Sequence, residues 1–106
     1  MKKVSCATTL LTLVLLFSGP FAAAEEDEVR RAAILSQSCN SCHGPGGYSP
    51  GAIPPLQGLS EEVFVRAMQD FKSGARPGTI MNRIARGYRD EDFVLMARYF
   101  LAQERR

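Results

Sequence analysis

The chain has 106 residues, of which 13 are Lys or Arg and 11 are Asp or Glu. This length leaves room for one small domain, and such a domain often needs a covalent or metal staple because its hydrophobic core is small. No block of basic residues interleaved with aromatic residues occurs, which argues against nucleic-acid binding.

The first 24 residues have the pattern of a secretory signal peptide. Lys2 and Lys3 form a positive start, residues 4–17 are almost wholly apolar, and the run 22–24 is a small-residue cleavage site. The alternative is a retained membrane anchor, but the apolar stretch is short for a span of about 20 residues. We expect cleavage after Ala24, so that residues 1–24 are removed and residues 25–106 form a single periplasmic domain that is not attached to the membrane.

Removal of the signal peptide changes both the charge and the cysteine count. Because Lys2 and Lys3 are lost, the mature chain has 11 basic and 11 acidic residues, and its net charge is near zero. Cys6 is lost as well, which leaves Cys39 and Cys42 of the three cysteines. Both remaining thiols belong to one motif, so no structural disulfide is expected.

The mature chain is predicted to begin with a helix over residues 27–38. Its acidic start, residues 25–28, suits a helix N-terminus, and apolar residues follow at helical spacing. The helix would run directly into Cys39. The apolar stripe expected to face the core consists of Val29, Ala32, Ala33 and Ile34.

The pentapeptide Cys39-Asn40-Ser41-Cys42-His43 is the C-x-x-C-H pattern of c-type haem attachment. Two thiols three positions apart can each add to one vinyl group of the same haem, and the next residue then lies where its imidazole can coordinate the iron. Zinc and thioredoxin-like sites also use C-x-x-C, but the adjoining histidine speaks against both. We therefore expect one covalently attached haem c, bound by Cys39, Cys42 and His43.

The remainder of the mature chain predicts one long loop and three helical segments. Residues 44–58 are too rich in Gly and Pro for a helix or strand, and such a loop could wrap the edge of the haem. No stretch alternates apolar and polar residues in the manner of a strand, so the fold class is all-α. The helical segments are expected at residues 60–73, 79–86 and 91–103, with Ser60 and Asp90 as N-caps and Gly74 as a C-cap.

Two polar features keep alternative interpretations. Tyr48 in the long loop could donate a hydrogen bond to a haem propionate or could be an ordinary surface tyrosine. Arg83 and Arg86 could lie near a propionate or a partner, but a solvated helix face is the preferred interpretation.

A six-coordinate haem needs a second axial ligand opposite His43. The chain has only one histidine, so two histidine ligands from this chain are excluded, and a methionine thioether is the usual alternative. Met81, in an irregular segment between a Pro-Gly turn and a glycine, is the preferred candidate. Met68 and Met96 lie on apolar helix faces, where core packing is expected. Ligation by both His43 and Met81 favours electron transfer, whereas an open iron position would allow ligand binding or peroxidase-like chemistry.

These features together resemble the class I c-type cytochromes, and the resemblance covers residues 27–103. The stretch Pro54-Pro55-Leu56-Gln57-Gly58 is similar to that family's P-x-L-x-G segment, in which the proline carbonyl accepts a hydrogen bond from the proximal histidine. By that match Pro54 orients His43. The family implies about four short helices around one covalent haem, with His43 and Met81 as the iron ligands.

Within the family, several stretches are most similar to the cytochrome subunits of flavocytochrome c sulfide dehydrogenases. That resemblance implies a periplasmic, FAD-containing flavoprotein partner that oxidises sulfide, with electrons passing from its flavin to this haem and on to a soluble cytochrome c. The chain would then be an electron-transfer subunit and not an enzyme by itself. The alternative is a free-standing periplasmic electron shuttle of the same fold. The matching stretches are residues 52–59, 74–88, 90–93 and 97–100.

Overall fold

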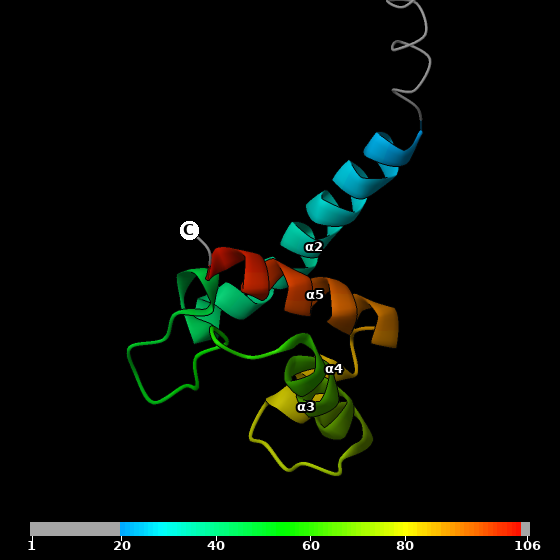
Figure 1. Cartoon of the computed structure of the whole chain (residues 1–106). Coiled ribbons are helices and arrows are strands. Elements are labelled where there is room, and N and C mark those ends of the chain that lie inside the picture. Colours follow the sequence, from blue (N-terminus) through cyan, green and yellow to red (C-terminus); the bar gives the residue numbers. More distant parts are fainter. Residues whose placement is uncertain (1–19, 105–106) are drawn as a thin grey trace, which may run out of the picture.

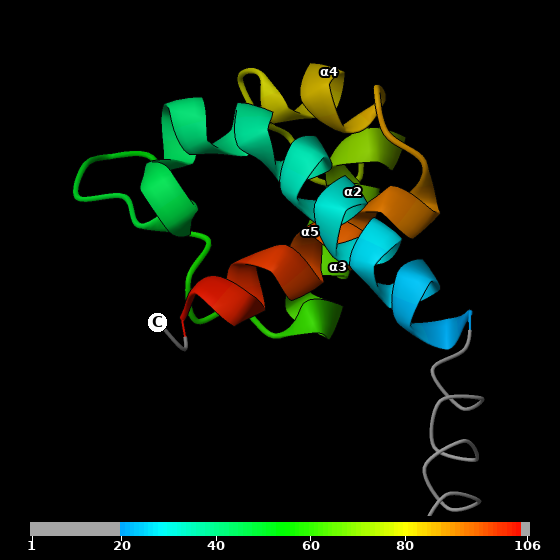
Figure 2. The same ribbon diagram turned by 90° about the horizontal axis from the view of Figure 1, so that it is seen from above.

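The computed structural model describes residues 20–104, which form helices joined by loops and contain no strand (Figures 1 and 2). The all-α prediction is therefore confirmed. Residues 1–19 of the predicted signal peptide lie outside the described residues, so cleavage after Ala24 stays a prediction. The elements are α2 (Phe21–His43), the 3₁₀ turn η1 (Pro45–Gly47), α3 (Glu61–Ser73), α4 (Met81–Ala85) and α5 (Asp90–Gln103).

The hydrophobic core lies where α2 and α3 pack against α5, and the short helix α4 packs on α3 (Figure 1). Phe93 and Met96 of α5 are fully buried. The ring of Phe64 from α3 lies 5.8 Å from that of Phe100, centre to centre. Burial of one such side chain stabilises the fold by about 1.5–3 kcal/mol, so α5 is the element on which the domain is built.

Helix α2 differs from the predicted helix at both ends and in its buried face. It begins at Phe21 and continues through the cysteine motif to His43. The predicted stripe is wrong at Val29 and Ile34, whose exposed fractions are 66% and 65%. Only the second half of α2 meets the core, where Ala32 and Ser36 are buried. Small side chains one turn apart let α2 approach its neighbour closely, and the first half of α2 projects away from the domain (Figure 1).

The helix caps agree with the prediction in α3 and differ in α5. Ser60 Oγ accepts a hydrogen bond from the Val63 N–H (3.2 Å), and Gly74 ends α3 with φ +87°. The N-cap of α5 is Arg89 and not Asp90. The Asp92 carboxylate reaches back to the Arg89 N–H (3.0 Å), which starts the helix one residue earlier than expected. Helix α4 is also shorter than the predicted segment 79–86.

The long loop is irregular as predicted, apart from η1, and Gly47 attaches it to the core. Its N–H donates to Gly44 O (2.9 Å), and its carbonyl accepts from the Leu56 N–H (2.8 Å). A Cβ at this position would lie 2.8 Å from Phe100 Cδ1, and φ is +78°. Glycine is therefore required here both for its conformation and for the close contact with α5.

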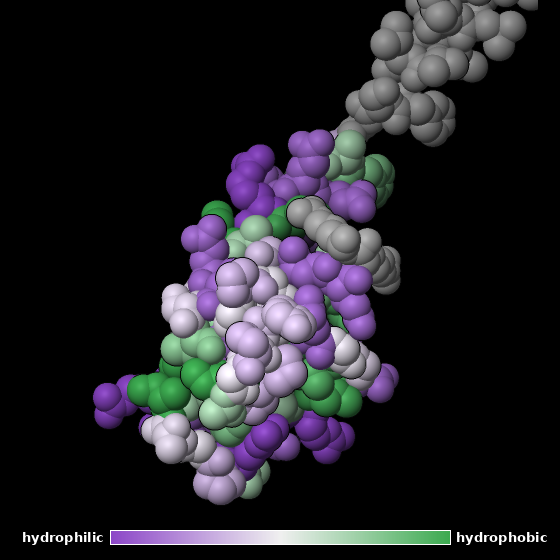
Figure 3. All heavy atoms as spheres, turned by 90° about the vertical axis from the view of Figure 1, so that its left-hand side faces the viewer, coloured by the Kyte–Doolittle hydropathy of each residue, from purple (hydrophilic) through white to green (hydrophobic). Residues whose placement is uncertain are grey.

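Within residues 20–104, no helix has the length and apolar character that crossing a membrane requires. On the face shown in Figure 3, hydrophobic side chains form separate patches between hydrophilic ones.

Candidate haem site

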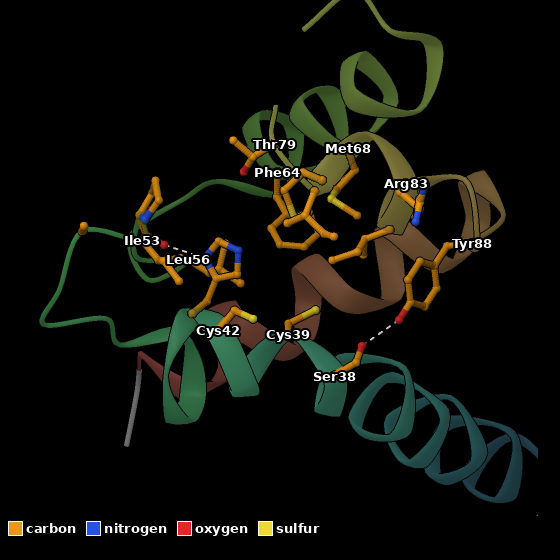
Figure 4. A pocket seen from close by; sticks show the side chains of 17 residues that line it. Ser38, Cys39, Cys42, Ile53, Leu56, Phe64, Met68, Thr79, Arg83 and Tyr88 are labelled. Carbon is orange, nitrogen blue, oxygen red and sulfur yellow. Dashed lines mark hydrogen bonds between the residues drawn. The ribbon is translucent and has the colours of Figure 1, made fainter. Parts of the chain in front are cut away.

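A cavity of about 770 Å³ opens between the end of α2, the loop around residues 52–56, α3 and the α4 segment (Figure 4). Its volume falls within the range of about 300–1,000 Å³ that is usual for ligand and cofactor sites. Apolar side chains from all of these segments form most of its walls. They include Ile53, Leu56, Phe64, Met68, Ile80 and Ile84.

The three residues of the predicted attachment motif line one side of this cavity. Cys39, Cys42 and His43 occupy the last turn of α2, where residues three and four positions apart share a face. Both thiols are free, and burial raises the pKa of the Cys39 thiol above its ordinary value. A thiol that stays protonated is a weaker nucleophile than a thiolate.

The imidazole of His43 is held by the carbonyl of Pro54. His43 Nδ1 lies 2.6 Å from Pro54 O. Because a carbonyl oxygen can only accept, Nδ1 carries a proton and donates, which in the neutral imidazole leaves the free lone pair on Nε2. The structure thus brings together the two residues that the family resemblance paired, and Nε2 is the nitrogen left for a metal.

The three methionine candidates differ in burial and in whether they line the cavity. Met81 is the first residue of α4 and lines the cavity. Met68 also lines the cavity, from α3, but is buried and packs in the core cluster. Met96 is fully buried in α5 and does not line the cavity. Two thioethers therefore reach this space, and the choice of Met81 as the iron ligand stays a prediction.

Arg83 and Tyr88 also line the cavity. Arg83 is exposed to solvent, in agreement with the solvated helix face that the sequence favoured, and it adds a charged side chain to a mainly apolar lining. Tyr88 places its hydroxyl 2.7 Å from Ser38 Oγ across the cavity wall (Figure 4). Tyr88 lies beyond the end of α4, so helical spacing from Met81 could not have placed it at the cavity, and only the tertiary structure brings it there. Tyr48 is exposed and does not line the cavity.

The buried carboxylate of Asp92 connects α2 with the start of α5, away from the cavity lining. Arg31 of α2 donates to Asp92 Oδ1 (2.8 Å), and the Arg89 N–H donates to Asp92 Oδ2 (3.0 Å). Burial opposes ionisation, but the hydrogen bonds from Arg89 and Arg31 outweigh it and hold the pKa of Asp92 below its ordinary value. The ionised carboxylate therefore joins α2 to the start of α5.

Comparison with known proteins gives three informative relatives, whereas no family model matches the chain. The chain is 47% identical over 70 residues to the cytochrome subunit of sulfide dehydrogenase from Chlorobaculum tepidum, covering 66% of this chain and 64% of that protein. It is 33% identical over 76 residues to cytochrome c4 from Azotobacter vinelandii, covering 62% of this chain and 36% of that protein. It is 32% identical over 87 residues to cytochrome c-554(548) from Halomonas halodenitrificans, covering 78% of this chain and 96% of that protein. The chain thus spans less than two thirds of the first two relatives.

Proposed function

The chain belongs to the class I c-type cytochromes, and we propose that it carries electrons in the periplasm as the haem subunit of a flavocytochrome c sulfide dehydrogenase. The observation that carries this proposal is the 47% identity to a sulfide dehydrogenase cytochrome subunit. The identities to cytochrome c4 and cytochrome c-554(548) are 33% and 32%. In this role the chain accepts electrons from an FAD-containing partner and is not catalytic by itself.

In the proposed role one haem c would occupy the cavity, and Cys39 and Cys42 would hold it through thioether bonds. The mainly apolar walls of the cavity suit the faces of a porphyrin, and the two free thiols lie on the same side as the His43 imidazole. When bound, this group supplies an iron that alternates between Fe(III) and Fe(II). His43 and Met81 are the proposed axial ligands.

The surrounding residues set the conditions for electron transfer. The Pro54 carbonyl keeps the proton on His43 Nδ1, so that the imidazole stays oriented with Nε2 available. Apolar side chains limit the access of water to the cavity, and a thioether ligand raises the reduction potential. If His43 and Met81 both held the iron, no position would remain for a substrate, which favours electron transfer over peroxidase-like chemistry.

Two isoleucines on the rim of the cavity support contact with a protein partner. Ile53 and Ile80 line the cavity yet have exposed fractions of 42% and 52%. Exposed apolar side chains at the edge of a redox site are suited to packing against another protein surface. A permanent flavoprotein subunit would bury them more completely than a transient partner would.

The second candidate function is a free-standing periplasmic electron shuttle. The alignment with cytochrome c-554(548) extends over 96% of that protein, so a cytochrome of about this domain's extent exists as a protein in its own right. The near-zero charge of the predicted mature chain is compatible with either function.

An absorption spectrum of the protein purified gently from its own host, before and after addition of sulfide, tests the proposal. Flavin bands beneath the haem bands, with haem reduction by sulfide, are expected for a subunit of the dehydrogenase. Dithionite added last defines complete haem reduction and serves as the control. A pure haem spectrum that sulfide leaves oxidised, while dithionite reduces it, would contradict the subunit role and support the shuttle.

A further inference from the structure

The hydroxyl groups of Ser38 and Tyr88 meet at 2.7 Å although the residues are 50 positions apart in the chain. Ser38 belongs to α2 and directly precedes Cys39, whereas Tyr88 follows α4, which begins at Met81. Both residues line the cavity, and Figure 4 shows the contact at its edge. The hydrogen bond therefore joins the wall that bears the cysteines to the wall that bears Met81.

This contact is the single hydrogen bond that the described residues show between α2 and residues 74–89. Helix α4 packs against α3, and within residues 20–104 it makes no comparable contact with α2 or α5. The side chain of Tyr88 consequently provides the hydrogen bond between the Met81 side of the cavity and α2.

The backbone of Tyr88 is held independently of its hydroxyl. Lys72 Nζ donates to Tyr88 O (2.9 Å) and also to Asp90 Oδ1 (2.7 Å). The Tyr88 N–H donates to Ala85 O (3.3 Å). The ring thus starts from a fixed point on the core, and loss of the hydroxyl alone would leave the ring and its packing in place.

We propose that Tyr88 is a positioning residue, whose hydrogen bond to Ser38 keeps the Met81 wall closed against α2 and slows the departure of Met81 from its place facing His43. This inference rests on the proposed function, in which Met81 is an iron ligand. An external ligand can enter only after this wall opens. Its apparent affinity is therefore the intrinsic affinity multiplied by the fraction of open molecules, and the tyrosine hydroxyl lowers that fraction.

The test is a titration of the ferric holoprotein with imidazole. Binding is monitored through the loss of the sulfur-to-iron charge-transfer band. Tyr88→Phe should raise the apparent imidazole affinity about twofold to fourfold, near the lower end for loss of one hydrogen bond because this one is exposed to solvent. Ser38→Ala should raise it by the same factor. The double variant should equal either single variant, because both substitutions remove the same contact.

Tyr99→Phe is the matched control. Tyr99 is half-buried against the core, does not line the cavity, and its hydroxyl makes no hydrogen bond within residues 20–104. Its variant should bind imidazole as the wild type does. The melting temperature of each variant, measured alongside, separates a change in opening of the cavity from a general loss of stability.

Two results would overturn the proposal, and they are distinguishable from each other. If the wild type shows the charge-transfer band but Tyr88→Phe leaves imidazole affinity unchanged, with or without a lower melting temperature, the hydrogen bond has no positioning role. If the wild-type ferric protein lacks the band, Met81 is not the ligand, and both the ligand assignment and this inference fail.

Discussion

The two walls of the cavity are built differently. The wall formed by the end of α2 and the loop to Pro54 rests on the core: Cys39 packs against it, and Gly47 lies against Phe100 of α5. The wall formed by residues 74–88 contains a helix of only five residues, α4. That second wall reaches the core through the small, fully buried side chain of Ala85, and hydrogen bonds of Asn82 and Tyr88 hold the segments around it.

This difference indicates which wall of the cavity opens more easily. Apolar packing over a large area does not fail at one contact, because many small attractions add up. A wall with a small packed area and a few polar contacts opens more easily when one of those contacts is lost. We therefore expect substitutions in the first wall to change the stability of the domain, and substitutions in the second wall to change the second ligand of the iron.

The largest effect is expected from Met81→Ala. Loss of the thioether should abolish the sulfur-to-iron charge-transfer band. It should also lower the reduction potential by on the order of 0.1 V, a part of the roughly 0.8 V range over which axial ligands set haem potentials. Absorption spectroscopy and potentiometry would measure both. Met96→Leu, in the core away from the cavity, is the control and should keep the band. If Met68→Leu loses the band and Met81→Ala keeps it, Met68 is the ligand.

The first wall is tested by Gly47→Ala. The new Cβ would overlap Phe100 and Leu56, and φ is +78°, so unfolding free energy should fall by about 2–4 kcal/mol through overpacking and backbone strain. Gly58→Ala is a matched control, since φ is +77° but no atom lies within 4 Å of a Cβ there. It should cost only the backbone strain, about 1–2 kcal/mol. Urea denaturation of the two variants measures the difference, and equal losses would show that the contact with α5 is unimportant.

In the second wall, Asn82 connects α4 to the end of α3 and the turn after it. Its Nδ2 donates to Phe71 O and Arg76 O, and its Oδ1 accepts from the Gly78 N–H, all at 2.8 Å. Asn82→Ala should lower the free energy of unfolding by about 2 kcal/mol and weaken the charge-transfer band.

Thermal denaturation and the absorption spectrum would check both effects. The control is Gln69→Ala, on the exposed face of α3, where no side-chain hydrogen bond occurs within residues 20–104. An intact band in a destabilised Asn82→Ala protein would show that α4 keeps its place without these bonds.

The smallest effect is expected from Asp92→Asn, which weakens the connection between α2 and α5. Because the pKa of Asp92 is lowered in the folded protein, its ionised form stabilises the fold above the ordinary carboxyl pKa of about 4, and this contribution is lost as pH falls through the folded pKa. At neutral pH the variant should lose about 1–2 kcal/mol, a modest value because the guanidinium groups of Arg31 and Arg89 are largely exposed to solvent.

Below about pH 4 the stability of the Asp92→Asn variant should approach that of the wild type. Unfolding measured from pH 7 to acid would show this convergence. Asp70→Asn, whose carboxylate forms no ion pair within residues 20–104, is the control. A constant gap between variant and wild type at all pH values would mean that the effect is not electrostatic.

Much of the site could be predicted from the sequence because it depends on neighbours in the chain. Cys39, Cys42 and His43 share a face of one helical turn wherever that helix is placed, and the Ser60 cap involves only the next three residues. The all-α class follows in the same way from helical spacing, caps and the absence of strand-like alternation.

Other features were decided only when distant segments packed together. Val29 and Ile34 fit a helical stripe, yet they are exposed because α2 meets the core only through its second half. Three methionines lie on similar apolar helices or turns, and only the packing of α3, α4 and α5 brings two of them to the cavity and buries Met96 in the core. The bond between Ser38 and Tyr88 spans 50 residues. Spacing along the chain encodes the local contacts, whereas such long-range contacts depend on how the whole set of helices shares one small core.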